Sequence, residues 1–215
     1  MKFLDRLEYK FGRRALRNLM LYIVIGMAIV FVSDFILYPQ IGITLSELFT
    51  FDRAMIFSGQ VWRVLTFVFL PPDSSIIFIV FALYFYWMIG SSLENAWGAF
   101  RFDVYYLVGV LGTIAGGLLV GSATNVYLNL SLFFAFAMLF PNHEVRLFFF
   151  IPIRVKWLAI LDAVLFVIGF VFSGWGGRVS MLVSVANFFL FFAGDFIEMF
   201  RSWKRKRQFR RDFRR

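Results

Sequence analysis

Long apolar stretches recur along the chain, separated by short segments that carry charged or turn-forming residues. Six of them are long enough to cross, or nearly cross, a membrane as an α-helix, which takes about 20 residues. They lie at residues 18–37, 74–92, 103–123, 126–141, 157–174 and 179–200, the fourth being the shortest. The pattern predicts an all-α membrane protein built as a bundle of six transmembrane helices.

The composition also indicates a membrane protein. Hydrophobic residues make up 61% of the 215 residues and charged residues 16%, whereas soluble domains have roughly 45–50% and about 25%. Such an apolar surplus needs lipid to cover it, which excludes a soluble enzyme and a disordered protein. The chain has no cysteine, which excludes a disulfide scaffold, a zinc site with thiolate ligands and a thiol nucleophile. We expect no metal and no cofactor.

The distribution of basic residues predicts the orientation. With a cytosolic N-terminus, six spans place 19 of the 22 Lys and Arg residues in cytosolic segments and three outside. Cytosolic loops of membrane proteins carry this kind of excess. We therefore expect an integral membrane protein, of a bacterial plasma membrane, with both termini in the cytosol.

Three segments flank or interrupt the predicted six-span domain, which covers residues 18–200. Residues 1–17 have one apolar helical face and basic residues elsewhere, as an interfacial amphipathic helix does. Residues 38–73 form an external loop apolar enough to pack on the membrane surface. Residues 201–215 are a basic tail, which is either a nucleic-acid patch or, as we expect, a cytosolic anchor that attracts anionic lipid.

Glycines repeat at four-residue spacing in the third predicted span. Gly112 and Gly116 form one such pair, and Gly117 and Gly121 form another. Small residues at this spacing let a neighbouring membrane helix approach closely. We expect another span to pack against this face.

Four motifs occur in order between residues 15 and 200. They are Gln60-Val-Trp-Arg-Val-Leu-Thr66, Leu93-Glu-Asn-Ala-Trp-Gly98 continuing to Arg101-Phe102, Tyr105-Tyr-Leu-Val-Gly109, and the run from Leu139-Phe-Pro-Asn142 to Lys156-Trp157. With these motifs the chain resembles the rhomboid superfamily, which implies the rhomboid-like six-helix fold. The resemblance implies a structural motif made of Trp62, Arg63, Glu94, Gly98 and Arg101. Within it, we expect Glu94 to accept backbone hydrogen bonds and to pair with Arg101.

Active rhomboids are intramembrane proteases that pair a Ser at the start of the fourth span with a His in the sixth. A serine hydroxyl needs such a base to become a nucleophile. Counted back from Pro141, the serine position falls on Val126, and the histidine position falls on Asn187. Because Asn accepts no proton at neutral pH, the resemblance implies that the catalytic dyad is degenerate and that the protein is not an enzyme. It is similar in this to the Derlin branch, which binds clients without cleaving them.

Other residues around the degenerate dyad support the same interpretation. No His, Asn or Gln occurs between Pro71 and Ala82, where the family's oxyanion residues fall. Tyr127, Phe189 and Leu190 replace small residues of the fourth and sixth spans. We expect these bulky side chains to separate the two helices or to fill the catalytic cavity.

No alternative catalytic centre is predicted. The single His, His143, lies in a predicted cytosolic loop, on the opposite side from the catalytic positions. His143-Glu144 begins like a zinc protease motif, but Leu147 stands where the second His belongs. Gly194-Asp195 resembles half of an aspartyl protease signature, whose chemistry needs two carboxylates, and Asp162 lacks the partner motif.

Four acidic residues, Asp34, Asp162, Asp195 and Glu198, lie in or near the predicted spans, where ionisable groups are costly and are candidates for function. We expect a local ion pair to explain each of them except Asp162, which lies deepest and has no evident local partner.

We predict a noncatalytic membrane protein that binds membrane-protein clients or partner subunits. In rhomboid-like folds a transmembrane segment approaches between the second and fifth spans, so the resemblance implies a client gate at Phe81, Phe85 and Phe166. The alternative is a small transporter or channel that uses Asp162. It is favoured if Asp162 faces a continuous polar cavity, and disfavoured if Asp162 has a hydrogen-bond partner inside a packed bundle. An active protease is a third possibility, which the residues do not support.

Overall fold

Helices dominate the computed structural model, which describes residues 2–72, 75–147, 151–183 and 185–192. Within these residues five segments are long and apolar enough to cross a membrane, one fewer than predicted, and they agree with the predicted all-α membrane bundle. They are Gly12–Gln40, which includes most of α2 (Leu19–Ile41), then α6 (Ile76–Trp97), α7 (Ala99–Val120), α9 (Val155–Phe172) and the helix at Trp175–Phe192. The last helix begins four residues before the predicted sixth span, of which residues 193–200 lie outside the described residues.

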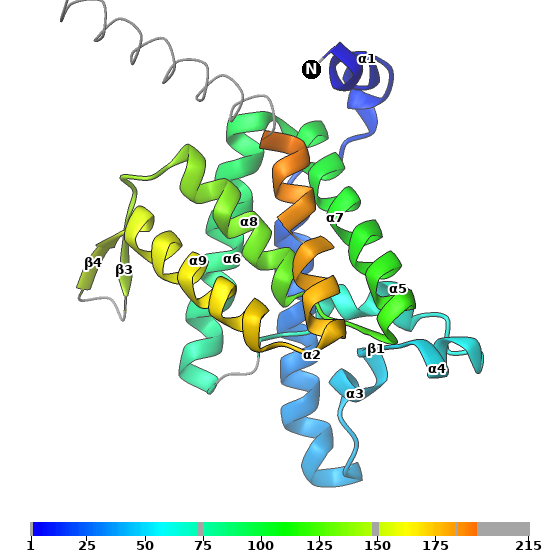
Figure 1. Cartoon of the computed structure of the whole chain (residues 1–215). Coiled ribbons are helices and arrows are strands. Elements are labelled where there is room, and N and C mark those ends of the chain that lie inside the picture. The colour runs from blue at the N-terminus through cyan, green and yellow to red at the C-terminus, as the bar shows by residue number, and fades with distance from the viewer. Residues whose placement is uncertain (1, 73–74, 148–150, 184, 193–215) are drawn as a thin grey trace, which may run out of the picture.

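The fourth predicted span corresponds to the short helix α8 (Val126–Leu139). Its 14 residues rise about 21 Å, less than the ~30 Å of the hydrocarbon core. Eight of these residues are buried, and α8 packs on α6, α7 and α9. Figure 1 shows α8 inside the bundle, with α6 behind it and the orange helix at Trp175–Phe192 beside it. It is therefore an inner helix, which needs its neighbours to cover it from lipid.

Bulky apolar side chains fill the centre of the bundle. Fully buried side chains come from α2, α6, α7 and α8, so the core joins helices that are far apart in sequence. The largest of these are Met20, Met27, Ile89, Leu93, Phe102, Tyr105, Leu128, Leu132 and Phe136.

The predicted close approach at the glycines of α7 involves the last helix. A Cβ atom on Gly112 would lie 3.0 Å from Val183 Cγ1, and one on Gly116 would lie 3.3 Å from Val183 Cγ2. Gly121 does not take part, because it ends α7 with a φ of +109° and has no atom within 4 Å of a built Cβ. Its role is to terminate the helix in a left-handed conformation that other residues seldom adopt.

The predicted loop 38–73 is a folded cap. It contains α3 (Leu45–Phe49), β1 (Phe51–Asp52), α4 (Arg53–Phe57), α5 (Arg63–Thr66) and the 3₁₀ helix η2 (Phe67–Phe69). β1 pairs with β2 (Ser122–Ala123), which joins the cap to the end of α7. Phe51 and Phe67 are buried and make an edge-to-face contact at 5.8 Å. Other apolar side chains of the cap, among them Phe57 and Val61, are exposed, as expected for a surface that meets lipid.

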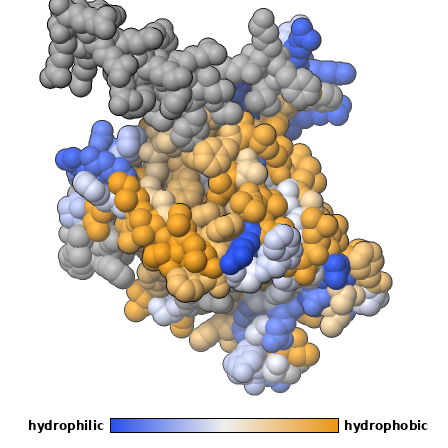
Figure 2. Space-filling model, viewed as in Figure 1, coloured by the Kyte–Doolittle hydropathy of each residue, from blue (hydrophilic) through white to orange (hydrophobic). Residues whose placement is uncertain are grey.

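Polar segments lie at the ends of the bundle. α1 (Lys2–Phe11) and the 3₁₀ helix η1 (Gly12–Arg14) lie at the end opposite the cap (Figure 1). In Figure 2, hydrophilic atoms gather over α1 and over the hairpin of β3 (Glu144–Leu147) and β4 (Ile151–Arg154), whereas hydrophobic atoms cover the helices between. The side chains of residues 1–5 and 11, and the whole basic tail 201–215, lie outside the described residues. The short strands β1–β4 are an addition to the predicted all-α architecture.

Candidate functional site

The two positions of the degenerate dyad have different surroundings. Val126 is the first residue of α8, is 54% exposed, and lines a cavity between α6, α8 and α9. Asn187 is buried on the last helix, and its Nδ2 donates a hydrogen bond to the Tyr105 carbonyl oxygen on α7 at 3.4 Å. The space beside Asn187 is filled, since a Cβ on Gly109 would lie 2.8 Å from Asn187 Nδ2 and 2.5 Å from Leu128 Cδ1.

Two of the bulky residues that were expected to fill the catalytic cavity, Phe189 and Leu190, have exposed side chains. Phe189 and Leu190 are 51% and 70% exposed, and Phe189 lines a cavity between α8, α9 and the last helix. Their neighbours Asn187 and Phe188 are the buried residues of this turn. Phe189 and Leu190 therefore do not lie in the interior beside Asn187, because the helix turns about 100° per residue and points consecutive side chains in different directions.

His143 and Val126 lie at opposite ends of α8. It follows the C-terminal end of α8, where its backbone nitrogen donates to the Phe140 carbonyl oxygen and its ring packs on Phe136 at 5.6 Å. Val126 begins α8, about 21 Å away along the helix axis. The single His of the chain therefore cannot reach a nucleophile placed at the start of α8.

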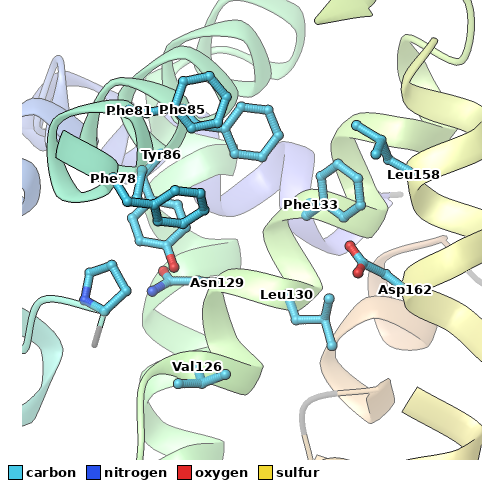
Figure 3. A pocket seen from close by; sticks show the side chains of 12 residues that line it. Phe78, Phe81, Phe85, Tyr86, Val126, Asn129, Leu130, Phe133, Leu158 and Asp162 are labelled. Atoms are coloured by element: carbon cyan, nitrogen blue, oxygen red, sulfur yellow. The ribbon is translucent and has the colours of Figure 1, made fainter. Parts of the chain in front are cut away.

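A lateral cavity lies between α6, α8 and α9, the second, fourth and fifth predicted spans (Figure 3). Its volume is about 480 Å³. The residues that line it are Pro72, Phe78, Phe81, Ala82, Phe85, Tyr86, Val126, Asn129, Leu130, Phe133, Leu158 and Asp162. Phe81 and Phe85, predicted at this place, stack on each other with their ring centroids 6.1 Å apart.

Two polar groups stand out among the apolar residues of the lateral cavity. Asp162 is half-buried on α9 and projects into the cavity in Figure 3. The Asn129 side chain on α8 is 5% exposed and interacts with the Tyr86 hydroxyl group. Within the described residues, Asn129 Oδ1 has no hydrogen-bond partner. Sequence reasoning missed Asn129, although a polar amide within an apolar helix is itself a signal.

Phe166 does not line the lateral cavity with Phe81 and Phe85. Its ring contacts Tyr127 and Phe134 of α8 at centroid distances of 6.5 and 6.4 Å. It lines a second cavity of about 500 Å³ between α8, α9 and the last helix. Phe166 lies eight residues after Leu158, and two four-residue steps rotate the side chain by about 80°. Phe166 therefore lies apart from the other two residues of the predicted gate.

Asp34 is a helix cap rather than half of an ion pair. Its carboxylate, near the end of α2, accepts hydrogen bonds from the Leu45 and Ser46 backbone nitrogens and from the Ser46 hydroxyl group. A carboxylate at the N-terminus of a helix satisfies N–H groups that have no partner within the helix. Asp195 and Glu198, for which ion pairs were also expected, lie outside the described residues.

The Leu-Glu to Arg-Phe motif lies at the α1 end of the bundle. Glu94 Oε1 accepts a hydrogen bond of 2.8 Å from the Asn18 backbone nitrogen, as expected for this residue, and so holds the start of α2. Gly98, with a φ of +86°, makes the turn that joins α6 to α7. Arg101 pairs with Glu8 of α1 at 2.8 Å rather than with Glu94, because α1 brings its own carboxylate to this end.

Trp62 and Arg63 hold the cap together. Arg63 is buried, and its Nη1 donates to the Glu47 and Thr50 carbonyl oxygens at 2.7 and 2.8 Å. Its Nε donates to Gln60 Oε1 at 2.7 Å. Trp62 Nε1 donates to the Leu48 carbonyl oxygen at 3.2 Å.

Comparison with known proteins identifies the domain. Residues 58–203 match the family model of the Rhomboid domain, which covers more than half of the chain. No curated protein matches it. The match includes the dyad positions and the whole lateral cavity.

Proposed function

The chain belongs to the rhomboid family of integral membrane proteins, and on that premise we propose that it is a noncatalytic, Derlin-like member that binds membrane-protein clients or partner subunits. One observation carries the proposal. The lateral cavity between α6 and α9 is formed and Val126 lines it at the serine position, while Asn187, at the histidine position, is buried on the last helix.

Three features support the lack of catalysis. Val126 has no nucleophilic atom, and Asn187 cannot act as a base. Asn187 Nδ2 is also directed to the Tyr105 carbonyl oxygen on α7, and Leu128 packs into the same place. The single His lies at the far end of α8.

The protease test uses the full-length protein in liposomes with a single-span model substrate and a fluorophosphonate probe. We expect no cleavage and no labelling, alongside an active rhomboid protease as the positive control. The Val126→Ser/Asn187→His double variant should stay inactive as well. Residue 126 is exposed at the lateral cavity, whereas residue 187 is buried against α7, so the new Ser and His do not share one site. Labelling that disappears in a single Ser→Ala variant, for example at the buried Ser131, would show a serine enzyme.

The client test places photocrosslinking residues on two surfaces. Positions Phe81 and Phe85 face the lateral cavity, and positions Leu107 and Leu111 on the exposed face of α7 are the control. We expect a discrete protein adduct from the cavity positions and mainly lipid adducts from α7. Equal, diffuse capture from both surfaces would contradict client binding.

The proposal includes the orientation of the protein and the membrane in which it lies. The positive charge of the chain ends supports both termini in the cytosol of a plasma membrane, with the cap outside and the basic tail bound to anionic lipid.

A small transporter is the second candidate, and Asp162 favours it. Its side chain lies in a cavity and has no hydrogen bond within the described residues. The remaining lining is mostly apolar, which does not form a continuous polar path. Proton flux into liposomes, measured with an internal pH dye and abolished by Asp162→Asn, would put transport first.

A further inference from the structure

We infer that the lateral cavity selects a membrane-spanning segment that carries a hydrogen-bond donor, best a Lys or Arg side chain, at the depth of Asp162. The inference rests on the proposed client binding and names the chemistry of the client. Its basis is the Asp162 carboxylate, an acceptor that projects into the cavity; the buried Asn129 amide lines the same cavity.

The Asp162 carboxylate and Asn129 Oδ1 have no hydrogen-bond partner among the described residues, although the Asn129 side chain interacts with the Tyr86 hydroxyl group. Asp162 has no hydrogen bond within the described residues, and an ionised carboxylate can only accept hydrogen bonds. Asn129 Oδ1 is buried without a partner in the same part of the chain. Buried polar atoms of native proteins are nearly always hydrogen-bonded, so an incoming donor gains contacts that the free bundle lacks.

The described part of the bundle offers no cation to Asp162. Lys156 lies six residues before it on α9, lines the second cavity and stacks over Trp157. Arg154 pairs with Glu144 in the hairpin, and Arg178 donates to the Phe170 and Val171 carbonyl oxygens beyond the other end of α9. A counter-charge for an ionised Asp162 therefore comes from outside these residues.

The depth of Asp162 indicates a protein segment rather than a lipid headgroup. Asp162 lies seven residues after Val155 and ten before Phe172, which is about 10 Å and 15 Å from the two ends of α9. The amines of lipid headgroups lie at the surface, and acyl chains carry no donor. A side chain in the middle of a transmembrane helix reaches this depth.

The size of the cavity limits how much of the client enters. A helix about 10 Å across occupies roughly 420 Å³ per turn of 5.4 Å, close to the cavity volume of about 480 Å³. The cavity thus accommodates about one turn, and the aromatic residues Phe78, Phe81 and Phe85 cover the apolar side chains of that turn. One polar side chain in that turn is sufficient to contact Asp162.

The test measures binding of synthetic single-span helices to the full-length protein in lipid nanodiscs by energy transfer. Three helices differ only at the central residue, which is Lys, Leu or Glu. We expect the Lys helix to bind about 5- to 30-fold more tightly than the Leu helix, the range for one polar contact within a membrane. Asp162→Asn should remove most of this preference, and Asp162→Lys should transfer it to the Glu helix. Lys156→Met, in the second cavity, is the matched control and should leave the preference unchanged.

The outcomes separate the two proposals. Equal binding of all three helices, unchanged by Asp162→Asn, would overturn donor selection and leave client binding intact. Binding of none of them would overturn client binding, and donor selection with it. The gain of Glu-helix binding by Asp162→Lys also shows that this variant is folded, so a loss of Lys-helix binding in it is not misfolding.

Discussion

Replacing Arg63 should loosen the cap without unfolding the bundle. Arg63 is 6% exposed and donates three hydrogen bonds, to the Glu47 and Thr50 carbonyl oxygens and to the Gln60 side chain. Arg63→Met keeps much of the apolar stem but leaves these three acceptors without their donor. Arg63→Lys keeps the charge but cannot reproduce the planar arrangement of donors.

The expected loss follows from these three bonds. A hydrogen bond to a charged group contributes about 1.5–3 kcal/mol, so three such bonds contribute at least about 4.5 kcal/mol. Water that enters the opened cap will offset part of this, since the cap lies at the end of the bundle. We expect Arg63→Met to lower the free energy of unfolding by about 3–5 kcal/mol, and Arg63→Lys by roughly half as much.

The assay combines unfolding in mixed detergent micelles with limited proteolysis of the cap. Arg53→Ala is the matched control, because Arg53 is an exposed Arg of the same cap that bonds to the Leu118 and Leu119 carbonyl oxygens. It should change the free energy of unfolding by less than about 1 kcal/mol. Equal effects of Arg63→Met and Arg53→Ala would refute the view that burial makes Arg63 the anchor of the cap.

Three further predictions concern packing, capping and orientation. Gly112→Leu should destabilise the bundle by about 1–3 kcal/mol in the same unfolding assay, because its Cβ meets Val183; Gly174→Ala, in open space, should be neutral. Glu94→Gln should cost about 1 kcal/mol by weakening the hydrogen bond to the start of α2, seen as faster hydrogen exchange there with α9 unaffected. Reporters fused at residues 1 and 215 should be cytosolic and one at Ser58 external; an external signal from either terminus would refute the six-span orientation.

The helices were predictable from the sequence, whereas the directions of their side chains were not. Composition and the length of the apolar runs placed the helices to within a few residues. A membrane helix is apolar on its lipid face and on its packed face, so it has no polar stripe that reveals its orientation. For this reason Phe166 was grouped with Phe81 and Phe85 although it lines the second cavity, and Phe189 was expected at the catalytic centre although its side chain is exposed.

Polar partners were also beyond the reach of sequence patterns. Asp34 caps α3, eleven residues later, and Arg101 pairs with Glu8, 93 residues earlier. Such contacts depend on how the cap and α1 fold back onto the bundle. The amide of Asn129 was visible in the sequence, but its importance depends on the cavity that α6 and α9 form around it.

The shortness of α8 has a consequence for the surrounding lipid. A lipid-exposed helix of about 21 Å would leave roughly 9 Å of hydrocarbon thickness unmatched, and hydrophobic mismatch costs energy for each ångström. Here α6, α7 and α9 surround α8. At the N-cap of α8, the buried Asn125 donates to the Val68 and Leu70 carbonyl oxygens, so backbone at this depth meets protein instead of acyl chains. Much of the mismatch is therefore absorbed within the protein, because α6, α7 and α9, which pack on α8, are closer to the thickness of the bilayer.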